Sequence, residues 1–230
     1  MGMDPGARAG VAPERADRSA GSRPALDTRL GLQLGVLAGP FYLAVGLLQA
    51  FLRDGFDLGR HPLSVLANGS GGWVQTANFV LTGLMVLAAS VAFGRVLGAK
   101  SRGLTWFLSA YGLALIAAAV FPADPVDGFP PGTPEGMPAS ISTRGLIHFA
   151  AGALGFTCLA LSCFFGARVM ARLNEAPLAR VSRFSGLAVV LGFFGGMALP
   201  FGVLGIWFAV IVGWAWLSLM SLRVQRVPAA

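Results

Sequence analysis

Residues 184–222 read FSGLAVVLGFFGGMALPFGVLGIWFAVIVGWAWLSLMSL, a stretch of 39 residues without one charged side chain. As a single α-helix this stretch would be about 58 Å long, whereas about 20 apolar residues are enough to cross the hydrocarbon core of a membrane. Pro200 and Gly202 lie near its middle, where proline removes a backbone donor and glycine loosens the helix. We therefore predict two membrane-spanning helices, 184–199 and 203–222, joined by a tight turn.

Four more apolar stretches of spanning length precede this one. The chain is 55% hydrophobic and 12% charged, whereas soluble domains carry about 25% charged residues. The predicted fold is therefore all-α: a polytopic transmembrane six-helix bundle over residues 29–223. Flanking it we predict a disordered cytoplasmic tail over 1–28, which has no apolar periodicity, and a short cytoplasmic tail over 224–230. The four earlier helices are predicted at 30–51, 73–93, 104–121 and 146–166.

The basic residues predict how the helices are oriented. Cytoplasmic loops of membrane proteins are enriched in Lys and Arg, and a cytoplasmic N-terminus places 14 of the 17 basic residues inside. Six crossings then return the C-terminus to the cytoplasm, so we expect a multi-pass protein of the bacterial inner membrane. The net charge is +7. Because the basic residues form short clusters outside the spans, this charge indicates membrane lipids as partners and no nucleic acid. The 14 basic residues placed inside are Arg8, Arg15, Arg18, Arg23, Arg29, Arg95, Lys100, Arg102, Arg168, Arg172, Arg180, Arg183, Arg223 and Arg226.

Glycines recur at four-residue spacing in two of the predicted spans. Gly31, Gly35 and Gly39 follow this spacing, as do Gly192 and Gly196. Small residues at this spacing allow two helix backbones to approach closely, which matters in lipid because hydrophobic association between helices is weak there. We interpret them as packing positions inside the bundle, with a homo-oligomer interface as the alternative.

Ionisable residues outside the cytoplasmic segments are concentrated in two outer loops. No Asp, Glu, Lys, Arg or His lies in the middle of a predicted span, which counts against an ion-coupled transporter with a buried carboxylate. Because binding residues are often carried by loops on a rigid scaffold, we predict a ligand-binding pocket on the outer face. The candidate residues are Arg60, His61, Ser64, Asp124, Arg144 and His148.

Three interpretations of these residues stay open. His61, Asp124 and His148 are the residue types that bind Zn²⁺, and Ser64 with a histidine is a candidate nucleophile and base. The third interpretation is structural, with ion pairs and hydrogen bonds that hold the loops in place. The spacings match no established metal or hydrolase motif, so the catalytic residues stay unknown and no cofactor is evident.

Several short motifs resemble those of a known membrane family. They are His-Pro-Leu-Ser at 61–64, Gly-Trp at 72–73, Phe-Pro-Ala-Asp-Pro at 121–125 and the histidine of GLIHFAAG at 145–152. Over about residues 30–222 the chain resembles the bacterial and archaeal proteins grouped as domain of unknown function 998. The resemblance implies a six-helix bundle and supplies no activity, substrate or cofactor.

The leading functional hypothesis is an integral membrane protein that binds a small ligand or a lipid headgroup at its outer face. The first alternative is a membrane-embedded enzyme, such as a zinc-dependent hydrolase, that acts on lipid or cell-envelope substrates. The second alternative is a structural or assembly subunit without a ligand, which the glycine spacings would also serve.

Overall fold

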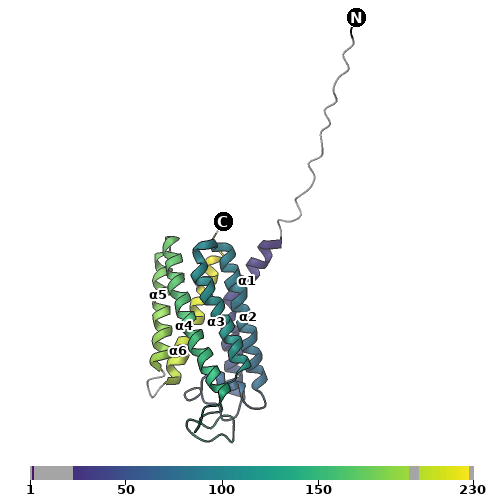
Figure 1. The fold of residues 1–230 in the computed structure, drawn as a ribbon, viewed down its shortest axis with the longest axis vertical. Coiled ribbons are helices and arrows are strands. Elements are labelled where there is room, and N and C mark those ends of the chain that lie inside the picture. Colours follow the sequence, from purple (N-terminus) through teal and green to yellow (C-terminus); the bar gives the residue numbers. More distant parts are fainter. Residues whose placement is uncertain (1, 3–22, 197–201, 228–230) are drawn as a thin grey trace.

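The computed structural model describes residues 2, 23–196 and 202–227, which form an elongated bundle of α-helices (Figure 1). Within these residues there is no β-strand, so the predicted all-α class is confirmed. The long helices are α1 (Arg23–Leu52), α2 (Gly72–Leu97), α3 (Arg102–Val120), α4 (Thr143–Arg172), α5 (Ala176–Val190) and α6 (Gly202–Val224). Short helical turns are η1 (Leu63–Ala67), η2 (Gly98–Ser101) and the π-helical turn η3 (Leu191–Gly195).

All six helices begin earlier along the chain than the apolar pattern predicted, and the difference is largest for α1 and α5. α1 begins at Arg23 and α5 at Ala176, because helical hydrogen bonding continues past the apolar core into turns that carry basic residues. The tail predicted for 1–28 falls mostly on residues 3–22, outside the described residues. The turn predicted between 199 and 203 lies outside them as well.

Five stretches of the described chain are long and apolar enough to cross a membrane. One of them, Gly72–Val120, has 49 residues and contains α2, η2 and α3. The chain reverses direction at η2, where Gly98 has a φ of +63°, a backbone conformation that glycine adopts without a steric cost. These apolar helices identify a multi-pass membrane protein.

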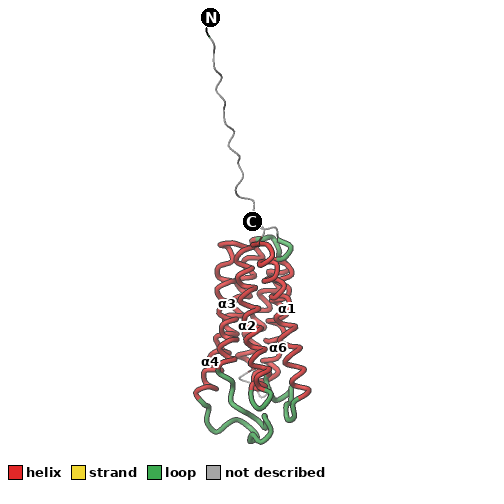
Figure 2. Tube along the Cα trace, turned by 90° about the vertical axis from the view of Figure 1, so that its right-hand side faces the viewer, coloured by secondary structure: helices red, strands yellow, loops and turns green. Residues whose placement is uncertain are grey.

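Neighbours in sequence pack side by side from α1 through to α6, and α6 also packs against α1. α6 therefore closes the bundle and contacts α2 and α4 as well. Figure 2 shows the loops that follow α1 and α3 gathered at one end of the bundle. The start of α1 and the end of α6 lie at the opposite end (Figure 1).

The glycine stripes lie at helix contacts within the chain. A Cβ built on Gly31 would be 2.7 Å from the carbonyl oxygen of Ala88 in α2, and one on Gly39 would be 2.5 Å from Cβ of Trp214 in α6. A further close approach joins η3 to α6, where a Cβ on Gly205 would be 2.5 Å from the carbonyl oxygen of Gly192. These glycines therefore allow backbone contacts that any side chain would obstruct.

Hydrogen bonds from small polar side chains connect the helices inside the apolar bundle. Ser90 in α2 donates to the carbonyl oxygen of Thr105 in α3 at 2.8 Å, and Ser218 in α6 donates to that of Val36 in α1 at 2.8 Å. Trp216 donates its indole N–H to Ser182 of α5 at 3.0 Å. Buried polar groups with partners add to the association of helices in lipid.

Substitution of Gly205 by alanine should destabilise the bundle, because the new methyl group would collide with backbone atoms that cannot rotate away. We expect a loss of about 1–3 kcal/mol, measured as a lower thermal unfolding midpoint of purified protein in detergent. Gly94→Ala is the matched control, since the nearest atom to its new Cβ is 3.7 Å away, in Thr105. Equal midpoints for the two variants would contradict the close-contact role of Gly205.

Candidate functional site

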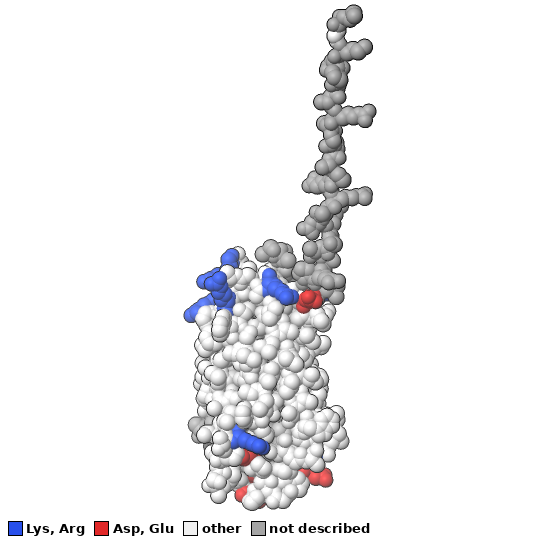
Figure 3. Space-filling model, turned by 45° about the vertical axis from the view of Figure 1, so that its right-hand side comes forward, with Lys and Arg blue, Asp and Glu red and all other residues white. Residues whose placement is uncertain are grey.

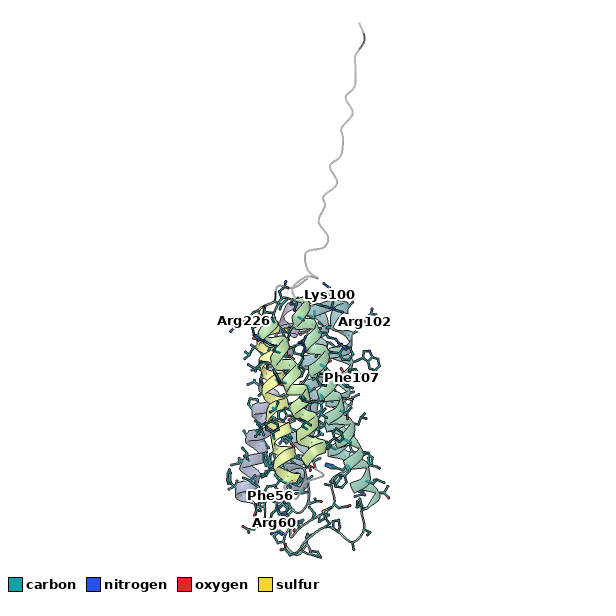
Figure 4. The ribbon with its side chains drawn as sticks, turned by 90° about the vertical axis from the view of Figure 1, so that its left-hand side faces the viewer. Phe56, Arg60, Lys100, Arg102, Phe107 and Arg226 are labelled. Atoms are coloured by element: carbon teal, nitrogen blue, oxygen red, sulfur yellow. The ribbon has the colours of Figure 1, made fainter. Side chains whose placement is uncertain are left out.

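The loop end of the bundle carries an ion-pair cluster at its surface. Arg60 donates from Nε and Nη2 to the two carboxylate oxygens of Asp127, at 2.9 and 2.7 Å, and also pairs with Glu135. Arg60 lowers the pKa of Asp127 to about 2, and the two carboxylates raise the pKa of Arg60. The cluster joins the loop after α1 to the loop after α3. Figure 4 labels Arg60 at this end, opposite Lys100, Arg102 and Arg226.

His61 is buried beneath that cluster, with a 1% exposed surface. Its Nδ1 accepts a hydrogen bond from the backbone N–H of Asp57 at 2.9 Å, so the ring proton lies on Nε2, which donates to the carbonyl oxygen of Asp127 at 2.9 Å. The rings of Phe56 and Phe129 lie beside the imidazole, with centroids at 5.3 and 5.6 Å. Both ring nitrogens of His61 are therefore engaged by loop backbone.

Asp124 organises the start of α4. It accepts hydrogen bonds from the backbone N–H of Ser142 at 2.8 Å and from the Ser142 hydroxyl at 2.5 Å. The Ser142 hydroxyl in turn accepts from the N–H of Gly145 and caps the helix, which satisfies a backbone donor that has no helical partner. A Cβ on Gly145 would be 2.2 Å from the Asp124 carboxylate, so this contact requires glycine.

Arg53 and Asn68 hold the first loop against the second. Arg53 donates to the carbonyl oxygens of Leu66 and Asn68, both at 2.5 Å, and its guanidinium lies 4.9 Å from the ring centre of Phe129. Asn68 donates to the carbonyl oxygen of Ala123 at 3.0 Å. The two loops therefore form one connected layer over the end of the bundle.

Beneath this loop layer lies a cavity of about 150 Å³ between the helices. It receives side chains from the helices α1, α2, α3, α4 and α6, from η3 and from the start of η1. None of the described residues that line it carries a formal charge. We call this space the aromatic cavity, after its lining side chains Tyr42, Phe79, Tyr111, Phe149, Phe156, Phe193, Trp207 and Trp214.

Three aromatic side chains with polar groups meet at one wall of the aromatic cavity. The ring of Trp214 lies 5.5 Å from that of Tyr42 and 5.6 Å from that of Tyr111. The tyrosine hydroxyls and the indole N–H can form hydrogen bonds, so this wall presents polar groups as well as apolar surface.

Ser64 and His148 are the two predicted site residues that line the aromatic cavity. His148 lies in the second turn of α4 and donates from Nδ1 to the carbonyl oxygen of Phe121 at 2.9 Å. In the neutral imidazole, Nε2 is then a hydrogen-bond acceptor. Ser64 belongs to η1, which brings a hydroxyl to the same space from the loop layer.

The other four predicted residues lie outside the cavity lining. Arg60, His61 and Asp124 belong to the loop layer, and Arg144 is exposed in the first turn of α4. His61, Asp124 and His148 do not form a metal-binding group: nowhere in the described chain do three His, Cys, Asp or Glu residues gather in a way that could hold a metal ion.

The predicted site did not include its aromatic members, because the prediction rested on ionisable residues in the loops. Their signal was nevertheless present. The chain has only two tyrosines, Tyr42 and Tyr111, and both lie within apolar stretches, away from the membrane interface where tyrosine is usually enriched. A tyrosine in the middle of a span brings a polar hydroxyl group into an apolar bundle.

Comparison with protein-family models gives one match. The model described as "Protein of unknown function (DUF998)" covers residues 36–223. The chain belongs to this family. This match confirms the resemblance inferred from the short motifs, and it includes every predicted site residue of this DUF998 chain. Comparison with curated proteins and with solved structures gave no match.

Loss of the ion pair between Arg60 and Asp127 should lower stability in a pH-dependent way. The folded pKa of Asp127, about 2, lies below its ordinary value of 3.8, so the stabilisation is present above pH 3.8 and is lost as the pH falls toward 2. The Asp127→Asn variant keeps a residue type that tolerates the φ of +52° found here. We expect a lower unfolding midpoint than that of wild type at pH 7 and a shrinking difference below pH 4. A difference that stays constant down to pH 2 would contradict the assignment.

Proposed function

We propose that this protein binds an uncharged or weakly polar amphiphile, such as part of a lipid, in the aromatic cavity. The observation that carries the proposal is the composition of the cavity wall: aromatic and aliphatic, without a formal charge, and with a few polar groups from Ser64, Tyr111, His148 and Trp214. Binding sites for small molecules are typically apolar, with a few polar groups that orient the ligand. This composition disfavours an ionic headgroup inside the cavity, because an unpaired charge there would be costly.

The size of the cavity limits what enters it. A volume of about 150 Å³ is comparable to engineered apolar cavities that hold a benzene molecule. A single ring, a short chain segment or the end of an acyl or isoprenoid chain fits this space. The rest of a longer amphiphile would extend between the helices toward lipid or toward the loop layer.

We further propose that six helices cross the membrane and that both termini face the cytoplasm. The 49-residue apolar stretch contains the reversal at η2, so it would supply two crossings. On the face drawn in Figure 3, Lys and Arg atoms gather at the end where α6 finishes, a wide uncharged band follows, and carboxylates are more frequent at the loop end. This distribution agrees with an excess of basic residues on the cytoplasmic side, and it would place the loop layer on the outer face.

A membrane-embedded hydrolase is the second candidate, and one observation favours it. Ser64 and His148 line the same cavity, as a nucleophile and its base would. The His148 Nδ1, however, is bonded to a backbone carbonyl group and not to a carboxylate that would stabilise an imidazolium. Covalent labelling of Ser64 by a fluorophosphonate, lost in His148→Ala, would favour this candidate over simple binding.

Filling the cavity should weaken binding without disturbing the fold. A Cβ on Gly152 would have only one neighbour within 4 Å, Cζ of Phe193 at 3.9 Å, so Gly152→Leu places its side chain in a region with free space. The reference protein for this experiment has the exposed Trp73 and Trp106 changed to Phe. Quenching of its remaining tryptophan fluorescence by bromododecanol should saturate. In Gly152→Leu we expect the apparent affinity to fall about tenfold or more, equivalent to about 1.4 kcal/mol.

Gly94→Leu is the control for this experiment, since Gly94 lies near the C-terminal end of α2 and does not line the cavity. The tryptophan fluorescence of this control should be quenched with the same saturation curve as that of the reference protein. Identical saturation curves for all three proteins would show that the quencher partitions into detergent and not into the aromatic cavity.

The proposed orientation predicts opposite labelling of two loop positions. Ser70 and Ala99 are exposed, in the loop after α1 and in η2 respectively. Ser70→Cys should react with a membrane-impermeant maleimide in intact cells, and Ala99→Cys only after the membrane is opened. The native Cys158 and Cys163 are buried, so the unmodified chain serves as an unlabelled control. Labelling of Ala99→Cys in intact cells would reject the orientation.

A further inference from the structure

A second hollow lies at the opposite end of the bundle from the loop layer, between α4 and α5. It is an open groove of about 610 Å³. Its walls combine three arginines with three apolar side chains, and we call it the arginine groove. The residues that line it are Phe164, Arg168, Arg180, Arg183, Phe184 and Leu187.

The positive charge of the arginine groove is not neutralised within the described chain. Arg168, Arg180 and Arg183 are exposed, and none of the described carboxylates forms a salt bridge with them. Across residues 143–196 the sequence contains a single acidic residue, Glu175. Glu175 is already paired with Arg223 of α6, which lowers its pKa.

Below the arginines the groove is apolar and open to the surroundings of the bundle. Phe184 is 69% exposed and Leu187 is 49% exposed. A Cβ on Gly186 would be 2.9 Å from the ring of Phe164 and 3.1 Å from the carbonyl oxygen of Ala160, so the glycine allows α5 to approach the ring closely. The groove therefore runs from a basic rim at the end of the bundle to an apolar floor along it.

We propose that the arginine groove binds one anionic phospholipid from the membrane leaflet at this end. Its phosphate would be held by Arg168, Arg180 and Arg183, and its acyl chain would lie on Phe184 and Leu187. Guanidinium groups bind phosphate through paired, charge-assisted hydrogen bonds, and basic pockets between membrane helices bind anionic headgroups. The site stands apart from the aromatic cavity, so it does not depend on the proposed function.

A phospholipid fits the groove better than a free phosphate ion does. A free ion would use the basic rim alone and leave Phe184 and Leu187 exposed. A phospholipid covers both parts, and contact with apolar surface adds to the charge-assisted bonds. Inorganic phosphate should therefore fail to displace the bound lipid at concentrations that leave the protein intact.

Native mass spectrometry of the full-length, delipidated protein in detergent tests the proposal. The probes are dioleoyl phosphatidylglycerol and dioleoyl phosphatidylcholine, added in equal amounts. We expect one phosphatidylglycerol to bind in preference to phosphatidylcholine. Because each basic residue near an anionic surface contributes about a fivefold effect, the variant Arg168→Gln/Arg180→Gln/Arg183→Gln should bind on the order of 100-fold more weakly.

The matched control removes three arginines from the same end of the bundle but outside the groove. Arg95→Gln/Arg102→Gln/Arg226→Gln changes the net charge equally, and these residues are also exposed. This control should keep its affinity for phosphatidylglycerol within about threefold. Equal losses in the two variants would overturn the proposal, because they would indicate general attraction between a basic surface and anionic lipid.

Two more variants keep the test decisive if the triple glutamine variant folds poorly. Lysine at all three groove positions preserves the charge, so binding should fall by less than tenfold. Phe184→Ala should weaken binding severalfold, whereas Phe51→Ala, at an exposed phenylalanine near the loop end, should not. No effect of Phe184→Ala, or displacement of the lipid by inorganic phosphate, would reject an acyl chain on the groove floor.

Discussion

The structure depends on the requirement that every backbone polar group inside a membrane must find its partner within the protein. Long α-helices meet this requirement residue by residue, and the apolar stretches of the chain adopt them. Lipid then removes most of the hydrophobic drive for helices to associate, so contact has to come from close packing. The stripe of Gly31, Gly35 and Gly39 on α1, and the pair of Gly192 and Gly205, place backbone against neighbouring helices for this reason.

The same constraint separates the polar chemistry of the molecule into distinct zones. In the loop layer, Arg60 and His61 join the loop after α1 to the loop after α3, and Asp124 binds Ser142 at the start of α4. This layer includes η1, which lines part of the aromatic cavity. Trp207 of α6 donates to the carbonyl oxygen of Leu58 in the loop layer at 3.1 Å. The hydrogen-bonded loop residues thus lie next to the cavity that Ser64 and His148 line.

At the end of the bundle opposite the loop layer, the arginine groove carries positive charge beside apolar surface. The aromatic cavity lacks charged walls, whereas the arginine groove combines three exposed arginines with the exposed side chains of Phe184 and Leu187. The first lies between the helices beneath the loop layer, and the second is open to the surroundings of the bundle at the other end. The difference follows from position, because guanidinium groups remain hydrated at the helix ends and would be costly in the middle of the bundle.

The sequence by itself determined the membrane class, the all-α fold and the family, because the length of apolar stretches and short motifs are local properties of the chain. It also indicated that Gly35 and its neighbours are packing positions. Only the tertiary structure decided which polar residues meet: it placed Ser64 and His148 on one cavity and left His61 and Asp124 in the loop layer. It also brought Tyr42, Tyr111 and Trp214 together from three helices. Spacing along the chain carries no information about such contacts, because they depend on how α1, α3 and α6 pack across the bundle.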